Sequence, residues 1–292
     1  MNGILRLTNN RYPVIKVLAA ALLFSMPVSV TYAGAIRSAD LFSNTLASED
    51  RDDGSTDAVA LGFTVRLNAT NFSNVYVNTN GNVTFGSALG SINFTPPADP
   101  DAPTKPSSLS DADRPILAPF FADVDTSASG KIEYGQGIIA GKNVFGVNWI
   151  DVGYFDARDD KLNSFQLIIT DRSDVKAGDF DFEFNYDKIA WETGSFSGGL
   201  DGLGRNSAHV GWSNGPGLAE TYLELPGSGE FGAFLDGGPN SLVANSRQSP
   251  QPGRYVIEVR DGIPLSNVPL PAGLPLFLSG LAFLGWRSKK VG

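Results

Sequence analysis

Acidic residues are the best candidates for site chemistry in this sequence. Asp123 and Asp125 are separated by one residue and Ser127 follows at the same spacing, so two carboxylates and a hydroxyl alternate as at the start of a calcium loop. Gly130 comes two positions late for an EF-hand, and Glu133 stands at the eleventh position rather than the twelfth. Acids at a strand end can instead cap backbone N–H groups in a turn. The sequence predicts at most a weak calcium site at Asp123 and Asp125, with solvated turn acids as the alternative.

Two glycine-rich segments fit motifs of catalysis and cofactor binding but lack the required context. Residues 211–215 read Gly-x-Ser-x-Gly, a nucleophile elbow that needs a histidine later in the chain, whereas the single histidine, His209, precedes it. Residues 227–232 read Gly-x-Gly-x-x-Gly, but a phosphate cradle needs a following helix, and glycine and proline close this segment. No catalytic and no cofactor-binding residue is predicted. A secreted polysaccharide hydrolase that uses paired carboxylates is the alternative function.

The first 35 residues have the order of a secretory signal peptide. Three basic residues precede an apolar run over residues 17–30, and no acid occurs before Asp40. The run ends on small residues, with Ala33 and Ala35 as an Ala-x-Ala cleavage box and residues 31–33 as the other choice. The apolar run is short for a membrane span. We therefore predict export of the chain and removal of residues 1–35.

Residues 263–292 have the order of a sorting tail. A fifteen-residue apolar stretch over 272–286 would be about 22 Å long as a helix, so it barely spans a bilayer core of about 30 Å. Arg287, Lys289 and Lys290 follow and should stay cytoplasmic. A plain single-pass anchor is the alternative. At the start of the stretch lies a short motif that consists of Val268, Pro269, Leu270, Pro271 and Ala272.

This motif, the short apolar helix and the basic end resemble the VPLPA variant of the PEP-CTERM sorting tails. The resemblance implies a Gram-negative bacterium and recognition of the tail by a membrane-embedded exosortase. The inner membrane would then hold the chain transiently through the tail. The protein itself would reside at the cell surface or in the extracellular matrix.

The composition of residues 36–262 excludes several classes of partner and site. This segment of 227 residues, long enough for one large domain, holds all 31 acidic residues but 16 of the 22 basic ones, which gives a net charge of −15. Such a surface repels phosphate backbones, so nucleic acid is a poor partner. The chain has no cysteine, which excludes disulfides and thiolate metal sites.

The patterning of this segment predicts an all-β, sandwich-like domain of two sheets with long loops, between the signal peptide and the short transmembrane helix. Over residues 179–187 aromatic and acidic residues alternate strictly, as on a strand with one buried face. Asn80 and Gly81 predict a hairpin turn, and Gly141 predicts another. The alternation places four rings in the core, with Asp181 and Glu183 toward solvent; the rings are Phe180, Phe182, Phe184 and Tyr186.

Several segments between residues 60 and 215 resemble the nidogen-like (NIDO) domain, in the order of that family. They are VNTNGNVTFG at 77–86, ILAPFFADVDT at 116–126, VFGVNW at 144–149, NSFQL at 163–167, FNY with IAWETG at 184–194, and HVGW at 209–212. The resemblance implies an extracellular, non-catalytic interaction or adhesion domain. Its partner would be a matrix protein or a polysaccharide.

Overall fold

The computed structural model describes residues 34–46, 51–89, 108–204, 206–215 and 222–265, which all belong to the unit Ala33–Gly292. Ala33 and the motif Val268 to Ala272 lie outside the described residues. Helix in the described part consists of short 3-10 turns, namely η1 (Ala39–Leu41) and η3 (Leu109–Asp111). No helix in these ranges is long and apolar enough to cross a membrane. The domain is therefore all-β, as the sequence predicts.

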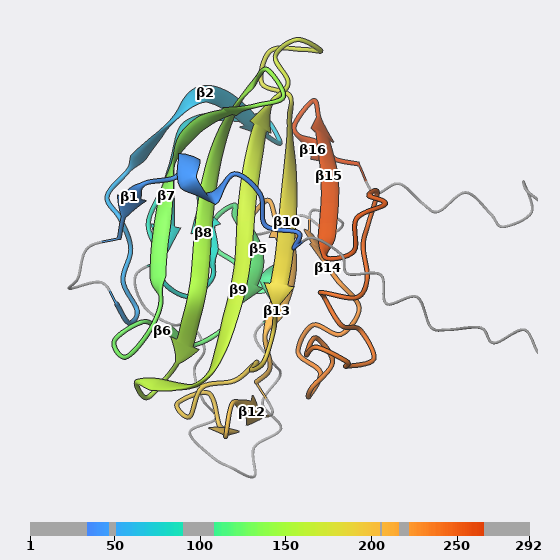
Figure 1. The fold of residues 1–292 in the computed structure, drawn as a ribbon. Helices are drawn as coiled ribbons and strands as arrows, with labels where there is room; N and C mark the ends of the chain where they lie inside the picture. Colours follow the sequence, from blue (N-terminus) through green and yellow to red (C-terminus); the bar gives the residue numbers. More distant parts are fainter. Residues whose placement is uncertain (1–33, 47–50, 90–107, 205, 216–221, 266–292) are drawn as a thin grey trace, which may run out of the picture. The chain divides into compact units, whose positions relative to one another are not determined.

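Two antiparallel sheets make up most of the described chain (Figure 1). The larger has the order β1 (Asn44–Thr45), β7 (Lys131–Ile139), β8 (Lys142–Tyr154), β9 (Arg158–Asp171), β10 (Phe180–Lys188), β15 (Arg254–Arg260) and β16 (Ile263–Pro264), with β6 (Val124–Asp125) also paired to β8. The smaller has the order β14 (Tyr222–Glu224), β13 (His209–Ser213), β5 (Ile116–Phe121), β4 (Asn82–Thr84), β3 (Thr70–Asn78) and β2 (Val59–Leu67). A separate ribbon pairs β11 (Gly199–Leu200) with β12 (Leu203–Gly204).

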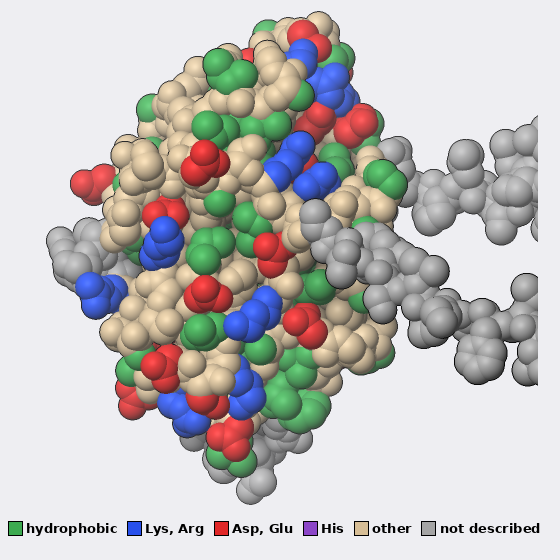
Figure 2. All heavy atoms as spheres, viewed as in Figure 1, with side chains coloured by type: hydrophobic (Ala, Val, Ile, Leu, Met, Phe, Trp, Pro, Cys, Tyr) green, Lys and Arg blue, Asp and Glu red, His purple; other side chains and the backbone are tan. Residues whose placement is uncertain are grey.

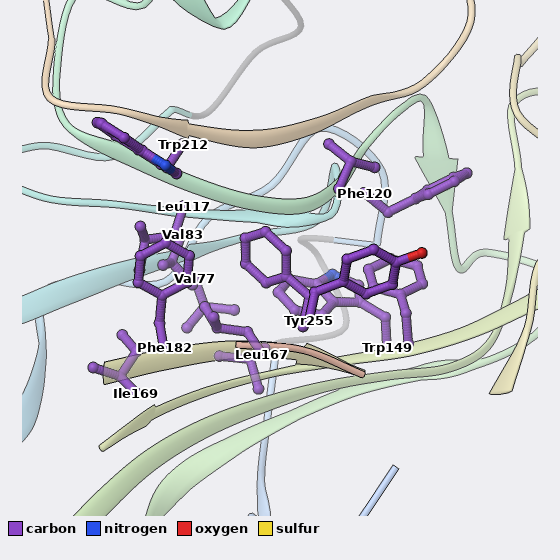
Figure 3. Packing of buried hydrophobic residues seen from close by; sticks show 14 of the residues in the cluster. Val77, Val83, Leu117, Phe120, Trp149, Leu167, Ile169, Phe182, Trp212 and Tyr255 are labelled. Atoms are coloured by element: carbon purple, nitrogen blue, oxygen red, sulfur yellow. The ribbon is translucent and has the colours of Figure 1, made fainter. Parts of the chain in front are cut away.

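The two sheets enclose one large apolar core (Figure 3). Side chains from the smaller sheet face those from the larger, and both predicted hairpins are present, as β3–β4 and β7–β8. At the first turn Gly81 has a φ of 69°, and a Cβ there would overlap the Phe120 carbonyl oxygen, so this position requires glycine. The core residues labelled in the close view include Val77, Val83, Leu117, Phe120, Trp149, Leu167, Ile169 and Phe182.

Strand β10 confirms the predicted alternation on its inner face and corrects it on its outer face. The four rings are at most 1% exposed, as predicted. Asp181 is partly exposed, between Arg172 at 2.5 Å and Arg260 at 2.7 Å. Glu183, predicted to face solvent, is only 6% exposed, because Arg37 covers it and donates two hydrogen bonds of 2.7 Å to its carboxylate.

The N-terminal segment Gly34 to Phe42, which we call the strap, lies across the outer face of the larger sheet before the chain enters β1 at its edge (Figure 1). Beneath it is a row of amide side chains, in which Gln166 donates to Asn148 at 2.8 Å and Asn185 donates to Gln166 at 2.9 Å. Asn148 and Gln166 also donate to backbone carbonyls of the strap at 3.0 and 2.8 Å. Elsewhere on this face, acidic and basic side chains are interspersed (Figure 2).

The strap is also anchored by one aromatic ring. Phe42 is fully buried and packs with Val144 and Ile168 in a small cluster separate from the main core. Gly146 lies directly beneath this ring, and a Cβ there would overlap it. The polar outer face that alternation predicts is thus converted locally into a second buried layer.

Candidate cation-binding site

Three segments that are distant in sequence meet around Asp123, which lies between β5 and β6. The turn after β3 contributes Asn80, whose side chain accepts the Val124 N–H at 2.9 Å and donates to Asp53 at 2.8 Å. The segment 51–53 is paired to β6 through a bridge between Asp52 and Asp125. Backbone and amide hydrogen bonds therefore fix the positions of the acids relative to one another.

Asp52, Asp53 and Asp123 bring their carboxylates together. One oxygen from each lies within 4.8 Å of the other two. Asp123 is 1% exposed, while Asp52 and Asp53 are partly buried. In the part of the chain that the structure describes, no Lys or Arg side chain forms an ion pair with any of the three acids. Among the described residues, therefore, no basic side chain neutralises the negative charge of these three acids.

The oxygens of Asp123 are poorly satisfied by the protein. Oδ1 is buried with no hydrogen-bond partner among the described residues, and Oδ2 accepts a long hydrogen bond of 3.4 Å from the Ser197 hydroxyl. Oδ1 of Asp52 is likewise buried and unpartnered within the described ranges. Gly194 packs against Asp123, and a Cβ at that position would overlap Oδ2. Buried polar atoms normally find partners, so two such oxygens in one cluster require an explanation.

Electrostatics at the cluster raise the pKa of all three acids. Burial, followed by the charges of Asp53 and Asp52, raises the pKa of Asp123 to about 7. Burial and then the charge of Asp125 raise the pKa of Asp52 to about 6. Burial also raises the pKa of Asp53, and the hydrogen bond from Asn80 opposes that shift. Ionised at neutral pH, the three carboxylates repel one another, and a proton or a cation would relieve the repulsion.

Asp125, the other acid of the predicted calcium site, has a different environment. Its two oxygens accept backbone N–H groups, from Ser127 at 2.7 Å and from Ala157 at 2.7 Å. This is the capping geometry that the turn alternative describes. The structure brings Asp123 together with Asp52 and Asp53, about 70 positions earlier, which spacing along the chain does not reveal.

The two glycine-rich segments, residues 211–215 and 227–232, are held by hydrogen bonds within the domain. On β13 the Ser213 hydroxyl accepts the Gly215 N–H at 3.2 Å, and His209 Nδ1 lies 2.8 Å from a Glu224 carboxylate oxygen. Residues 227–232 form turns, with no helix between 225 and 246. These turns are held by the fully buried Glu192, which sequence reasoning did not single out and which accepts from Ser207, Gly232 and Phe234 at 2.5 to 2.7 Å.

Comparison with known proteins identifies the family. Residues 30–233, more than two thirds of the chain, match the model described as NIDO related. The chain belongs to the NIDO-related family. The match includes all three clustered acids and ends before β15 and β16, so the NIDO-related domain of this chain is completed by two strands beyond the family model.

Parts of three much longer proteins are similar to this NIDO-related domain. Alpha-tectorin of Mus musculus is 32% identical over 202 residues, which cover 61% of this chain and 8% of alpha-tectorin. Nidogen of Drosophila melanogaster is 25% identical over 187 residues, 52% of this chain and 13% of that protein. Nidogen-2 of Mus musculus is 35% identical over 120 residues, 39% of this chain and 8% of that protein. The similarity thus spans about a tenth of these relatives. No solved structure matches this chain.

Proposed function

We propose that this chain is an exported, non-catalytic interaction module that binds a matrix protein or a polysaccharide at the cell surface or in the extracellular matrix. The observation that carries the proposal is membership of the NIDO-related family, supported by the similarity to alpha-tectorin and nidogen. That resemblance implies an extracellular adhesion role. The net charge of −15 over residues 36–262 agrees with a partner other than nucleic acid.

The geometry of the acids argues against the alternative of a polysaccharide hydrolase. A glycosidase places two carboxyl groups about 5 to 9 Å apart on either side of the scissile bond. Here one oxygen from each of the three acids lies within 4.8 Å of the other two, and Asp123 is 1% exposed. Because Asp123 is almost inaccessible, this cluster does not present two carboxyl groups to the glycosidic bond of a polysaccharide.

A binding experiment with the producing cell's own matrix tests the proposal. The tagged full chain, solubilised in detergent, is incubated with isolated extracellular matrix, and bound components are recovered with the tag. We expect a matrix protein or polysaccharide to be retained and to be displaced by excess untagged chain. The same matrix is screened for released sugars. Sugar release that disappears in the Asp123→Asn variant would overturn the non-catalytic proposal in favour of the hydrolase.

We further propose that the C-terminal tail is a transient anchor, recognised at Val268 to Ala272 by an exosortase-type enzyme. The support is the order of motif, short apolar stretch and terminal basic cluster. Arg287, Lys289 and Lys290 are too costly to move through hydrocarbon, so they keep the end of the chain in the cytoplasm. Replacing Pro269 and Pro271 with alanine should leave the chain uncut in the membrane fraction, and deleting residues 268–292 should release it. Equal release of the double variant and the natural chain would contradict motif recognition.

A further inference from the structure

The Asp52, Asp53 and Asp123 carboxylates have the dimensions of a cation site. Calcium binds oxygen ligands at about 2.3 to 2.6 Å, so two ligands of one ion lie at most about 5 Å apart. One oxygen from each of the three acids lies within 4.8 Å of the other two, inside that limit. The donors are all carboxylate oxygens, which suit calcium or magnesium better than zinc or copper.

A second observation is independent of the clustering of charge. Asp123, which contributes one of the three close oxygens, is 1% exposed. Its Oδ1 is buried and accepts no hydrogen bond from any of the described residues. Oδ1 of Asp52 is also buried and likewise has no hydrogen-bond partner among the described residues. An acid that caps a turn accepts hydrogen bonds from backbone N–H groups, and the neighbouring Asp125 does so. Oδ1 of Asp123 and Oδ1 of Asp52 accept no such bond within the described residues.

We propose that Asp52, Asp53 and Asp123 bind one divalent cation, calcium in an extracellular setting. Asp53 is held in place by Asn80, and Asp52 by the bridge to Asp125. The cation links the segment before β2 to the turn between β5 and β6, which the chain otherwise joins through strand pairing and single hydrogen bonds. Gly194 and Ser197 pack against the Asp123 carboxylate, so the bound ion also fixes the segment that leads into the β11–β12 ribbon.

Calorimetric titration of the full chain with calcium chloride, after removal of divalent ions with EDTA, tests the site. We expect one ion per chain with a Kd of roughly 0.1 to 1 mM, the range of extracellular calcium modules. At 10 mM calcium the melting temperature should exceed that in EDTA by about 3 to 10 °C. Absence of both binding and a thermal shift, with calcium and with magnesium, would overturn the proposal.

Three variants distinguish a calcium site from a general effect of removing negative charge. Asp123→Asn should abolish the calcium-induced shift while melting in EDTA at or above the temperature of the natural chain, because it removes a buried charge. Asp57→Asn, the same change at an exposed acid, should keep the natural affinity. Asp125→Asn should lower the melting temperature equally with and without calcium. A calcium shift that survives Asp123→Asn, or that Asp57→Asn weakens as strongly, would contradict the site.

Calcium binding does not depend on the proposed function. A chain that binds matrix but not calcium removes this inference alone. A chain that binds calcium but no matrix component keeps the site and removes the interaction role.

Discussion

At the residue scale, the buried rings of β10 and its outer acids should contribute very differently to stability. Phe182 is 1% exposed, and its ring centre lies 5.3 Å from that of Phe184, so Phe182→Ala should cost about 3 to 5 kcal/mol. Asp181→Asn keeps the volume and one acceptor oxygen between Arg172 and Arg260, so we expect about 1 to 2 kcal/mol. Chemical denaturation measures both. Equal losses would mean that β10 is not buried on one face as described.

Glu224 gives a stability term that depends on pH. Burial raises the pKa of this carboxyl, but hydrogen bonds from His209, the Leu109 N–H and Ser108, with the charge of His209, bring it below the ordinary value of 4.5. A lowered pKa contributes stability above pH 4.5, and that contribution is lost as the pH falls through the folded-state pKa.

Glu224→Gln should therefore destabilise the domain at pH 7 and not in acid. We expect a cost of about 1 to 2 kcal/mol at pH 7, shrinking toward zero below pH 4.5, when urea unfolding is followed at several pH values. Glu230→Gln, at an exposed position, is the matched control and should show neither the cost nor its pH dependence. A cost that stays constant down to pH 3 would contradict the role assigned to the charge.

The clustered acids show how far residue types alone can lead. The sequence pointed to Asp123 because carboxylates alternate there, and it paired Asp123 with Asp125 because they are neighbours. Asp52 and Asp53 were missed, since no local pattern connects them to a turn about 70 positions later. The difference between an acid with free oxygens and one that caps backbone N–H groups depends on tertiary contacts.

At the scale of elements, the strap makes a prediction about Gly146. Because a Cβ at this position would overlap the buried Phe42 ring, Gly146→Ala should displace the ring and cost about 1 to 3 kcal/mol. Gly135→Ala, on the neighbouring strand, meets its nearest atom at 3.3 Å and should be tolerated. Thermal unfolding compares the two variants. Equal melting temperatures would mean that the strap is not seated on the sheet in solution.

The alternation of side chains with period two predicts which residues of a strand are buried in the core. It does not predict that the strap covers the outer face of the sheet. Alternation specifies which side chains share a face, and so Phe180 to Tyr186 were placed correctly. It does not specify what covers the opposite face, and Glu183 was predicted to be exposed although Arg37, 146 positions earlier, covers it. The two hairpins were predictable because their turn residues are local.

At the scale of the whole molecule, the order of the motif segments along the chain is enough to predict the family, because each segment has a fixed place in the fold. The turn 79–81 contacts β5 and β6, and Trp149 donates to the Thr79 carbonyl oxygen at 3.1 Å. Strands β15 and β16 follow the family match, and β15 contributes Tyr255, Ile257 and Val259 to the core.

The structure also favours one of the two predicted N-terminal cleavage positions. Ala35 is 1% exposed, its carbonyl accepts from Arg254 at 2.8 Å, and the Ile36 N–H donates to Asp187 at 3.2 Å. Cleavage after Ala33 keeps these contacts, whereas cleavage after Ala35 removes a buried residue of the domain. We therefore expect the mature chain to begin at Gly34.

The proposed role depends most on export of the chain. The most direct test of export is to measure the intact mass of the native chain separately in the extracellular and cellular fractions of the producing cell. We predict that the chain is recovered outside the cell, beginning at Gly34 and ending at or near Ala272. A chain recovered from the cell interior with the mass of residues 1–292 would contradict the extracellular role. An extracellular chain that still ends at Gly292 would contradict processing of the tail.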